Sequence, residues 1–523
     1  MREPCILTRG KMPTFAAIDI GSNSCRLKIA AVQMHKLKTL YEAREVTRLG
    51  ESVFETGVIS PEAMATTIRA LKRFHKAVQA HVVDKVRVVA TSATRDARNA
   101  AAFGAWVKSA TGWHLEVISG LEEGRLIHLG VATLEPGARG RCLMIDLGGG
   151  SCEITHSEHG RIKSMVSTPL GAVRLQQEFL HSDPTSKEDL AQLERFIHRE
   201  LLRAEKKLGQ VSVPLVIATS GTAAALAEAS AALFKKRASR AKTKALEADT
   251  TSVRKVAHML AKMTNAERVQ VPGIGPKRSE IIIGGAYVYA QLLERMGLKG
   301  FRYSPLGLRD GVLAQMLAET DIRADVHQQM EVERWNGIRE LCRRYGVDPR
   351  KNEPVRAHVA QLFDSLHVVH ELPPEYRLWL EAAAMMQDVG KYMNHQGHHR
   401  HTQYILANSE IYGFSPEQRA IVSAIARYLG KSRPDAMDRI MRAVPAEEHT
   451  SVARAVGLLR LAVGLNQDRA SAAVKLRIKV YPKRVVLDLA AARGGAELEV
   501  WSLRKEADYF FEVFRRALVV EAV

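Results

Sequence analysis

The sequence has little cysteine and no long apolar run. Its five cysteines are spread over 523 residues without a CxxC pair, which argues against a disulfide framework and against a zinc site. No run approaches the roughly 18 apolar residues that a membrane-spanning helix needs, and the first residues lack the apolar core of a secretory signal. We therefore expect a cytoplasmic protein that does not cross a membrane.

Aromatic residues are also scarce, at 6% of the chain. No aromatic cluster of the kind that stacks on single-stranded nucleic acid is present, which argues against RNA binding. Basic residues are abundant: 76 Lys and Arg stand against 57 Asp and Glu, a net charge of +19. Such an excess attracts anions without identifying them. Polyphosphate, nucleic acid and anionic lipid all fit, and so does a solvated basic surface that has no ligand.

The chain length suggests three or four domains, at roughly 100–200 residues each. The first part alternates short β-type runs with amphipathic helices, and the stretch from about 319 to 465 is nearly all helical in pattern. Strands return over 473–489, and a final helix is expected over 506–518. We predict two α/β domains at 1–140 and 141–320, an all-helical domain at 321–465 and a small α+β domain at 466–523.

Two segments of the α/β part resemble each other. AIDIGSNS (17–24) and MIDLGGGS (144–151) each read as a strand that ends in an aspartate and a glycine-rich turn. Asp19 and Asp146 are 146 − 19 = 127 positions apart, about one domain length. The repeat predicts an internal duplication, and the first motif reads as the turn of a hairpin formed by 15–20 and 25–32.

Glycine-rich turns of this kind suit phosphate. Glycine lets the backbone approach an anion and point its N–H groups at the oxygens, while an aspartate at the strand end can hold Mg²⁺ or one of its waters. Two such turns facing each other predict a phosphate cleft with Asp19 and Asp146 as metal ligands. The alternative is that each aspartate merely caps its turn.

A third turn, Ser220-Gly221-Thr222, follows a predicted strand and opens an alanine-rich helix. A helix N-terminus is a ready anion site, although an ordinary strand–turn–helix with a threonine cap reads the same way. Together the three turns give these candidate phosphate-binding residues: Gly21, Ser22, Asn23, Ser24, Gly148, Gly149, Gly150, Ser151, Ser220, Gly221 and Thr222.

Six segments, in this order and spacing, resemble the exopolyphosphatase / guanosine pentaphosphate phosphohydrolase (Ppx/GppA) family: AIDIGSNSCRL (17–27), RVVATSATRDARN (87–99), VISGLEEGRLI (117–127), LMIDLGGGSCEI (143–154), IATSGTAAAL (217–226) and SPLGLRDGVL (304–313). The resemblance is strong to about residue 320 and weaker beyond. It implies a duplicated actin-like ATPase (ribonuclease H-like) fold that acts on phosphoanhydrides, with Mg²⁺ or Mn²⁺ as cofactor, a monovalent cation as a further candidate, and a homodimer.

The resemblance also implies roles for three further residues. Glu123 aligns with the catalytic glutamate, whose carboxylate can accept the proton of the attacking water. Its neighbour Glu122 is the alternative, and both also fit as plain acids at a helix N-terminus. Arg95 is placed on the terminal phosphates, which a guanidinium can grip with two hydrogen bonds; a local pair with Asp96 is the alternative. Glu153 is linked to the metal and shares a strand face with Ser151.

The segment 380–406 resembles an HD phosphohydrolase core, in which a His-Asp pair binds metal. Here the pair reads Gln387-Asp388, and glutamine is a poor ligand for transition metals beside imidazole. We expect an HD-like domain with a damaged metal centre, although His358 and the group His398, His399 and His401 remain. The basic and histidine-rich surface of this domain could lengthen a channel for a long polyanion or support dimerisation, or the histidines could be a polar helix cap. The basic stretch 234–250 could be an arm that contacts a polyanion, or a solvated helix or loop.

Four functions follow. The first is an exopolyphosphatase that uses Mg²⁺ and a glutamate-activated water. The second is a guanosine pentaphosphate 5′-phosphohydrolase with the same apparatus. An actin-fold kinase is disfavoured, because the motifs are those of the hydrolases and Glu123 suits a water. A non-catalytic polyanion-binding or nucleotide-binding regulator is the fourth; it would be attractive if Glu123 or either aspartate were missing, and all three are present.

Overall fold

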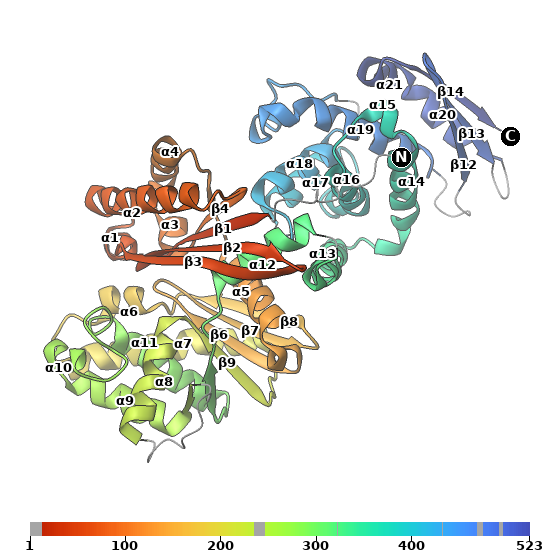
Figure 1. Cartoon of the computed structure of the whole chain (residues 1–523). Helices are drawn as coiled ribbons and strands as arrows, with labels where there is room; N and C mark the ends of the chain where they lie inside the picture. The colour runs from red at the N-terminus through yellow and green to blue at the C-terminus, as the bar shows by residue number, and fades with distance from the viewer. Residues whose placement is uncertain are drawn as a thin grey trace. The chain divides into compact units, whose positions relative to one another are not determined.

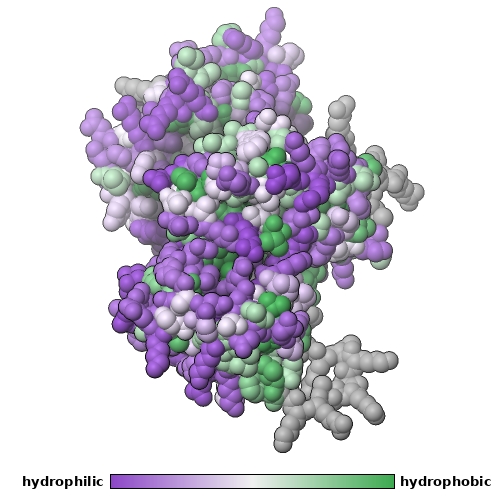
Figure 2. Space-filling view, turned by 90° about the vertical axis from the view of Figure 1, so that its left-hand side faces the viewer, coloured by the Kyte–Doolittle hydropathy of each residue, from purple (hydrophilic) through white to green (hydrophobic). Residues whose placement is uncertain are grey.

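A computed structural model describes residues 13–234, 246–321, 323–409, 411–430, 432–467, 474–490 and 495–522. The chain divides into two compact units between Met330 and Glu331, and each is considered by itself (Figure 1). On the face shown in Figure 2, hydrophilic residues predominate and hydrophobic ones form small, separate groups. Within the described ranges no helix has the length and apolar character that crossing a membrane requires.

Lobe I, residues 14–117 of the first unit, is built on a five-stranded sheet of order β3-β2-β1-β4-β5. Its strands are β1 Thr14–Ile20, β2 Ser24–Gln33, β3 Lys36–Val46, β4 Lys85–Ala90 and β5 Leu115–Val117. The first three pair antiparallel, which confirms the predicted hairpin, and β4 and β5 add in parallel. The helices are α1 Leu49–Thr56, α2 Pro61–Ala80, α3 Ser92–Asp96 and α4 Ala100–Thr111. Apolar residues of α1, α2 and α4 form one core with the sheet.

Helix α2 shows how local sequence sets an element of this lobe. Pro61 stands at the first helical position, where its missing N–H costs nothing. The Ser60 hydroxyl accepts a hydrogen bond from the Ala63 amide at 3.2 Å and so caps the helix. Buried residues such as Ile68 and Leu71 then recur at helical spacing and face the sheet. The helix predicted from Pro61 is confirmed.

Lobe II, residues 142–303, repeats this plan with the order β10-β11-β9-β6-β7-β8. Its strands are β6 Cys142–Leu147, β7 Cys152–Glu158, β8 Arg161–Thr168, β9 Leu215–Thr219, β10 Glu247–Asp249 and β11 Gly300–Tyr303. Its helices are α6 Ala172–Phe179, α7 Lys187–Leu208, α8 Ser220–Phe234, α9 Thr250–Lys262, α10 Asn265–Val269 and α11 Ile282–Arg295. The order β8-β7-β6-β9-β11 matches that of lobe I, as the duplicated motifs predict. Residues 235–245 of the basic stretch lie outside the described residues.

Two helices, α5 Gly120–Leu134 and α12 Leu308–Thr320, join the lobes (Figure 1). Their apolar residues share one core with β1 of lobe I and β6 of lobe II. The two helices cross at a point where each has a glycine, because a Cβ at Gly130 would lie 2.6 Å from the Gly311 amide nitrogen. The crossing therefore depends on the absence of side chains at these two positions.

The second unit, 331–523, packs helices and a small sheet around one core that includes Ile338 and Val520. Its helices are α13 Asp325–Arg344, α14 Glu353–Ser365, α15 His367–His370, α16 Glu375–Met386, α17 His398–Asn408, α18 Pro416–Arg427, α19 His449–Gly464, α20 Glu497–Lys505 and α21 Ala507–Phe514. Helix α13 begins in the first unit. The sheet, of order β12-β13-β14, contains β12 Lys475–Val480, β13 Arg484–Ala490 and β14 Ala517–Ala522.

The expected final helix over 506–518 is wrong at its end. Helix α21 stops at Phe514, and Ala517–Ala522 forms β14 instead. This segment contains the β-branched pair Val519 and Val520, which favours a strand, and it pairs in parallel with β13. Tertiary pairing therefore overrides the helical pattern of the preceding residues.

Candidate active site

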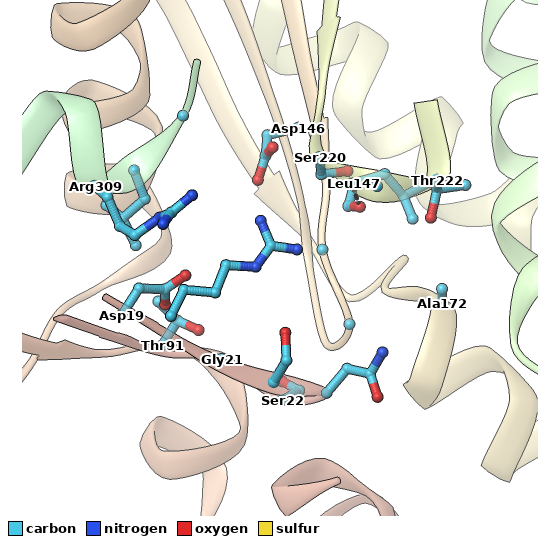
Figure 3. A pocket seen from close by; sticks show the side chains of 18 of the residues that line it. Asp19, Gly21, Ser22, Thr91, Asp146, Leu147, Ala172, Ser220, Thr222 and Arg309 are labelled. Atoms are coloured by element: carbon cyan, nitrogen blue, oxygen red, sulfur yellow. Dashed lines mark hydrogen bonds between the residues drawn. The ribbon is translucent and has the colours of Figure 1, made fainter. Parts of the chain in front are cut away.

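The two glycine-rich turns lie against each other and border one pocket. In Figure 3 the carboxylates of Asp19 and Asp146 and the Ser22 hydroxyl point into the same space. Gly150 has no room for a side chain, because a Cβ there would lie 2.8 Å from the Ser22 hydroxyl oxygen of the other lobe. The pocket encloses about 410 Å³, which is ample for several phosphate groups.

Most of the predicted site residues line this pocket. They are Asp19, Gly21, Ser22, Asn23, Ser24, Glu123, Asp146, Gly148, Gly149, Gly150, Ser151, Ser220, Gly221 and Thr222. Arg95 and Glu153 are not among the lining residues, but both adjoin Glu123. The three glycine turns, which come from β1, β6 and β9, therefore meet at one place.

Three carboxylates cluster at one end of the pocket. Glu123 begins α5, Asp146 ends β6, and Glu153 lies directly opposite Asp146 on β7. Each offers an oxygen, and these oxygens lie within 4.8 Å of one another. Glu153 accepts a hydrogen bond from the Ser167 hydroxyl at 2.7 Å, and Asp146 accepts one from the Thr219 hydroxyl. Such a set of oxygens suits a hard divalent cation.

Two buried oxygens of the cluster support this fit. Within the described part of the chain, Glu123 Oε2 and Glu153 Oε2 have no hydrogen-bond partner. Buried polar atoms are normally paired, and these two oxygens without a hydrogen bond belong to one cluster of carboxylates, which fits a bound cation. Asp19 lies outside this cluster of three, and its role as a metal ligand stays a prediction.

Burial raises the pKa of the three clustered carboxyls and of Asp19. The pKa of Glu123 rises well above its usual value through desolvation and the neighbouring Glu153. Desolvation and Asp146 raise the pKa of Glu153 to about 8, and desolvation raises that of Asp146 as well. Desolvation also raises the pKa of Asp19 to about 6, against the opposing effect of Arg26. A bound cation would favour the charged forms again.

The structure distinguishes Glu122 from Glu123. Glu122 accepts two hydrogen bonds of 2.8 Å from the guanidinium of the buried Arg125. The Glu122 carboxylate is therefore held in an ion pair with a residue one turn further along the same helix. Glu123 instead lies in the pocket wall, with Oε2 3.8 Å from the Arg95 guanidinium. The geometry favours Glu123 as the carboxylate available for chemistry.

Arg95 lies on the short helix α3 beside this carboxylate. Its guanidinium donates to the Ile118 carbonyl at 2.7 Å, which directs it toward the start of α5. The alternative partner, Asp96, pairs with Arg174 of lobe II. Arg95 is thus next to the cluster and about a quarter exposed.

Four arginines of the pocket wall were missed by sequence reasoning: Arg26, Arg44, Arg278 and Arg309. Among the described residues no carboxylate lies within ion-pair distance of the first three, and Arg309 is 3.8 Å from Glu42. Burial and the neighbouring arginines lower the pKa of Arg278 to about 10, and they lower that of Arg309 as well. Three of the four guanidinium groups therefore have no ion-paired carboxylate in the part of the chain that the structure describes.

A signal for one of these arginines was available. In the β1–β2 hairpin, Arg26 lies directly opposite Asp19, and residues opposite each other in antiparallel strands share a face. Arg44 lies opposite Arg26 in the next pair, β2–β3. Arg278 and Arg309 come from distant segments, and only the tertiary fold brings them to the pocket.

Of the histidines of the second unit, His398 lies near Asp388, whereas His358 bonds other residues. Asp388 Oδ1 lies 2.9 Å from Lys391 Nζ and 3.8 Å from His398 Nε2. His358 instead bonds the Asn466 side chain at 2.8 Å and the Val474 carbonyl at 3.0 Å. Within the described ranges, the one group of His, Cys, Asp and Glu with metal-ligand spacing is the pocket cluster. The HD-like nature of this unit stays a prediction.

Comparison with known proteins identifies relatives of both units. The model of the Ppx/GppA phosphatase family matches residues 28–320, and that of Ppx/GppA phosphatase domain III matches 334–507. A Ppx/GppA family member from Aquifex aeolicus is similar at 29% identity and a TM-score of 0.50, covering 60% of this chain and 99% of its own. An exopolyphosphatase from Cytophaga hutchinsonii is similar at 25% identity and a TM-score of 0.54, covering 58% and 98%.

Proposed function

The chain belongs to the Ppx/GppA phosphatase family, whose members are hydrolases of phosphoanhydrides, and we propose that it is an exopolyphosphatase. It would release orthophosphate from the ends of inorganic polyphosphate. The observation that carries the proposal is the pocket itself. It joins two glycine turns, a cluster of three carboxylates and four arginines, three of which have no carboxylate within ion-pair distance among the described residues.

The terminal phosphate would lie between the glycine turns of the two lobes. Backbone N–H groups of the turns and the N-terminus of α8 supply partial positive charge, and the Ser22 hydroxyl is buried there without a partner among the described residues. Arg95 would hold the same phosphate from the side of Glu123. Asp146 and Glu153 would hold Mg²⁺ or Mn²⁺, with Asp19 facing it from lobe I. When bound, such an ion neutralises phosphate charge.

Glu123 would act on the attacking water. Its carboxylate accepts one proton from that water while the water oxygen bonds to the terminal phosphorus. The bond from phosphorus to the bridging oxygen breaks, and the shortened chain leaves with that oxygen. A base works best when its pKa lies near the working pH, and the raised pKa of Glu123 is in the appropriate direction.

The arginines favour a long polyanion as the substrate. One terminal phosphate needs few cations, yet Arg26, Arg44, Arg278 and Arg309 extend the positive wall beyond the carboxylate cluster. Guanidinium groups suit successive phosphates of a chain, and the net charge of +19 speeds the encounter. Guanosine pentaphosphate is the second candidate. The feature that favours it is the Tyr303 ring in the wall, which offers a surface on which a base can stack.

The test measures orthophosphate release from long-chain polyphosphate and from guanosine pentaphosphate, with Mg²⁺ and then with excess chelator. Glu123→Gln should lower the rate about a thousandfold, as expected for the loss of a general base. Glu122→Gln serves as the comparison and should retain activity within about tenfold, with thermal unfolding as the check on folding. Faster release from the nucleotide would move the function to alarmone turnover. Binding without release would indicate a regulator.

A further inference from the structure

Arg174 joins the two lobes at the rim of the pocket. It lies in the first turn of α6, and this helix borders the pocket at Ala172 (Figure 3). The guanidinium is 16% exposed. Its Nε donates to the Gly150 carbonyl at 2.9 Å, and one terminal nitrogen donates to the Ser92 hydroxyl at 3.3 Å and to the Asp96 carboxylate. Its central carbon lies 4.1 Å from the centre of the Phe54 ring.

These partners belong to different parts of the site. Gly150 is in the glycine turn of lobe II, whereas Phe54, Ser92 and Asp96 lie on α1 and α3 of lobe I. Asp96 directly follows Arg95, the arginine next to Glu123. One side chain therefore fixes the second glycine turn and the helix that carries Arg95. Arg174 is not among the residues that line the pocket, so it acts through the groups it holds.

A second ion pair between the lobes provides a comparison. Arg48 of lobe I lies 3.1 Å from Glu280 of lobe II, and both side chains are 49% exposed. An exposed pair of this kind contributes little, because water and salt screen it. The Arg174 guanidinium is more enclosed, makes hydrogen bonds in several directions and stacks on an aromatic ring, which strengthens the contact.

We propose that Arg174 is a positioning residue that holds the lobes closed around the end of the polyphosphate chain. This inference rests on the proposed function of the pocket. In the closed arrangement the glycine turn of lobe II and Arg95 both face Glu123. Without Arg174 a smaller fraction of the molecules is closed, and the apparent affinity for substrate falls in proportion to that fraction.

The first experiment measures kcat and KM for polyphosphate in Arg174→Met, whose apolar chain still covers Phe54. KM should rise about tenfold as the closed fraction falls, with thermal unfolding close to that of the wild type. A purely structural role would lower the active fraction, and hence kcat, while KM stayed constant. Arg174→Lys keeps the charge but loses the forked geometry, so it should recover part of the KM. Arg48→Met is the matched control and should leave KM within about twofold.

A double-mutant cycle tests the route through α3. Asp96→Asn alone should raise KM about fivefold, and the double variant should be no worse than Arg174→Met because both remove one contact. Fully multiplicative effects would contradict the inference. Asp96→Asn also keeps the test decisive if Arg174→Met does not fold.

A binding measurement separates this inference from the proposed function. Calorimetry compares the binding of inorganic tripolyphosphate to the Glu123→Gln variant and to the double variant that also contains Arg174→Met. The double variant should bind about tenfold more weakly. Equal binding would overturn the role of Arg174 and leave the proposed function standing. If the wild-type chain neither cuts nor binds phosphate chains, the proposed function fails and this inference fails with it.

Discussion

The two hairpins that form the pocket have the same topology but differ in the residue that lies opposite the aspartate. In lobe I, Asp19 on β1 lies opposite Arg26 on β2. In lobe II, Asp146 on β6 lies opposite Glu153 on β7. The neighbour on the other side differs as well, because Asp19 is beside Val89 on β4, whereas Asp146 is beside Thr219 on β9 and accepts a hydrogen bond from its hydroxyl. The duplicated motifs therefore surround their aspartates with different chemistry.

This difference gives the two sides of the pocket opposite charges beside their aspartates. The cation opposite Asp19 lowers the pKa of that carboxyl against the effect of burial, and it adds positive charge where a phosphate must bind. The Glu153 carboxylate opposite Asp146 adds negative charge that favours a bound cation, and the pKa of Glu153 rises to about 8. Under the proposed function, lobe I would therefore hold phosphate and lobe II would hold the metal ion.

The largest effect is expected when lobe II is made to resemble lobe I. Glu153→Arg places a guanidinium opposite Asp146 and removes one oxygen of the cluster. Because a bound metal supplies several kcal/mol of charge stabilisation, phosphate release should fall about a thousandfold, and added Mg²⁺ should not restore it. The control is Glu158→Arg, further along β7 and outside the cluster. Wild-type rates in Glu153→Arg would show that the metal binds elsewhere.

A smaller effect is expected from Thr219→Val, which gives Asp146 an apolar neighbour like the Val89 of lobe I. The lost hydrogen bond no longer orients the carboxylate, so the Mg²⁺ concentration for half-maximal rate should rise about tenfold or more. The rate at saturating Mg²⁺ should change little. Thr133→Val removes a hydroxyl that donates to the Leu129 carbonyl within helix α5 and should leave the Mg²⁺ titration unchanged. An equal shift in both variants would argue against this role for Thr219.

The smallest effect is expected in lobe I itself. Arg26→Met removes one charged contact to phosphate, worth about 1.5 kcal/mol, so KM for polyphosphate should rise about tenfold. The Mg²⁺ titration should not move. Lys38→Met removes an exposed cation of β3 outside the pocket and serves as the control. If Arg26→Met shifted the Mg²⁺ requirement instead of KM, the division between the lobes would be wrong.

Much of this site is local in sequence and could be predicted. Each glycine turn, with its aspartate, is a short segment between two strands, and the start of α5 with Glu123 follows a strand directly. The choice between Glu122 and Glu123 could also have been made, because Arg125 stands three positions after Glu122 and such neighbours pair on a helix.

Other parts depend on contacts between distant segments. Arg278 and Arg309 reach the wall from loops and helices that no local pattern connects to Asp19. Strand β14 forms because β13 offers an open edge, and neither the pairing nor its parallel direction is encoded within the segment Ala517–Ala522. Such features require the assembled core, since each depends on where a remote element has already packed.

The crossing of α5 and α12 at Gly130 and Gly311 fixes the orientation of α5 at one point along its length. Glu123 stands seven residues from Gly130, about 10 Å along the helix axis at 1.5 Å per residue. A tilt of α5 by about 10° at this crossing would move the carboxylate by about 2 Å, which is enough to break its hydrogen bond to a water. The close contact between Gly130 and Gly311 would thereby determine where the Glu123 carboxylate lies relative to the attacking water.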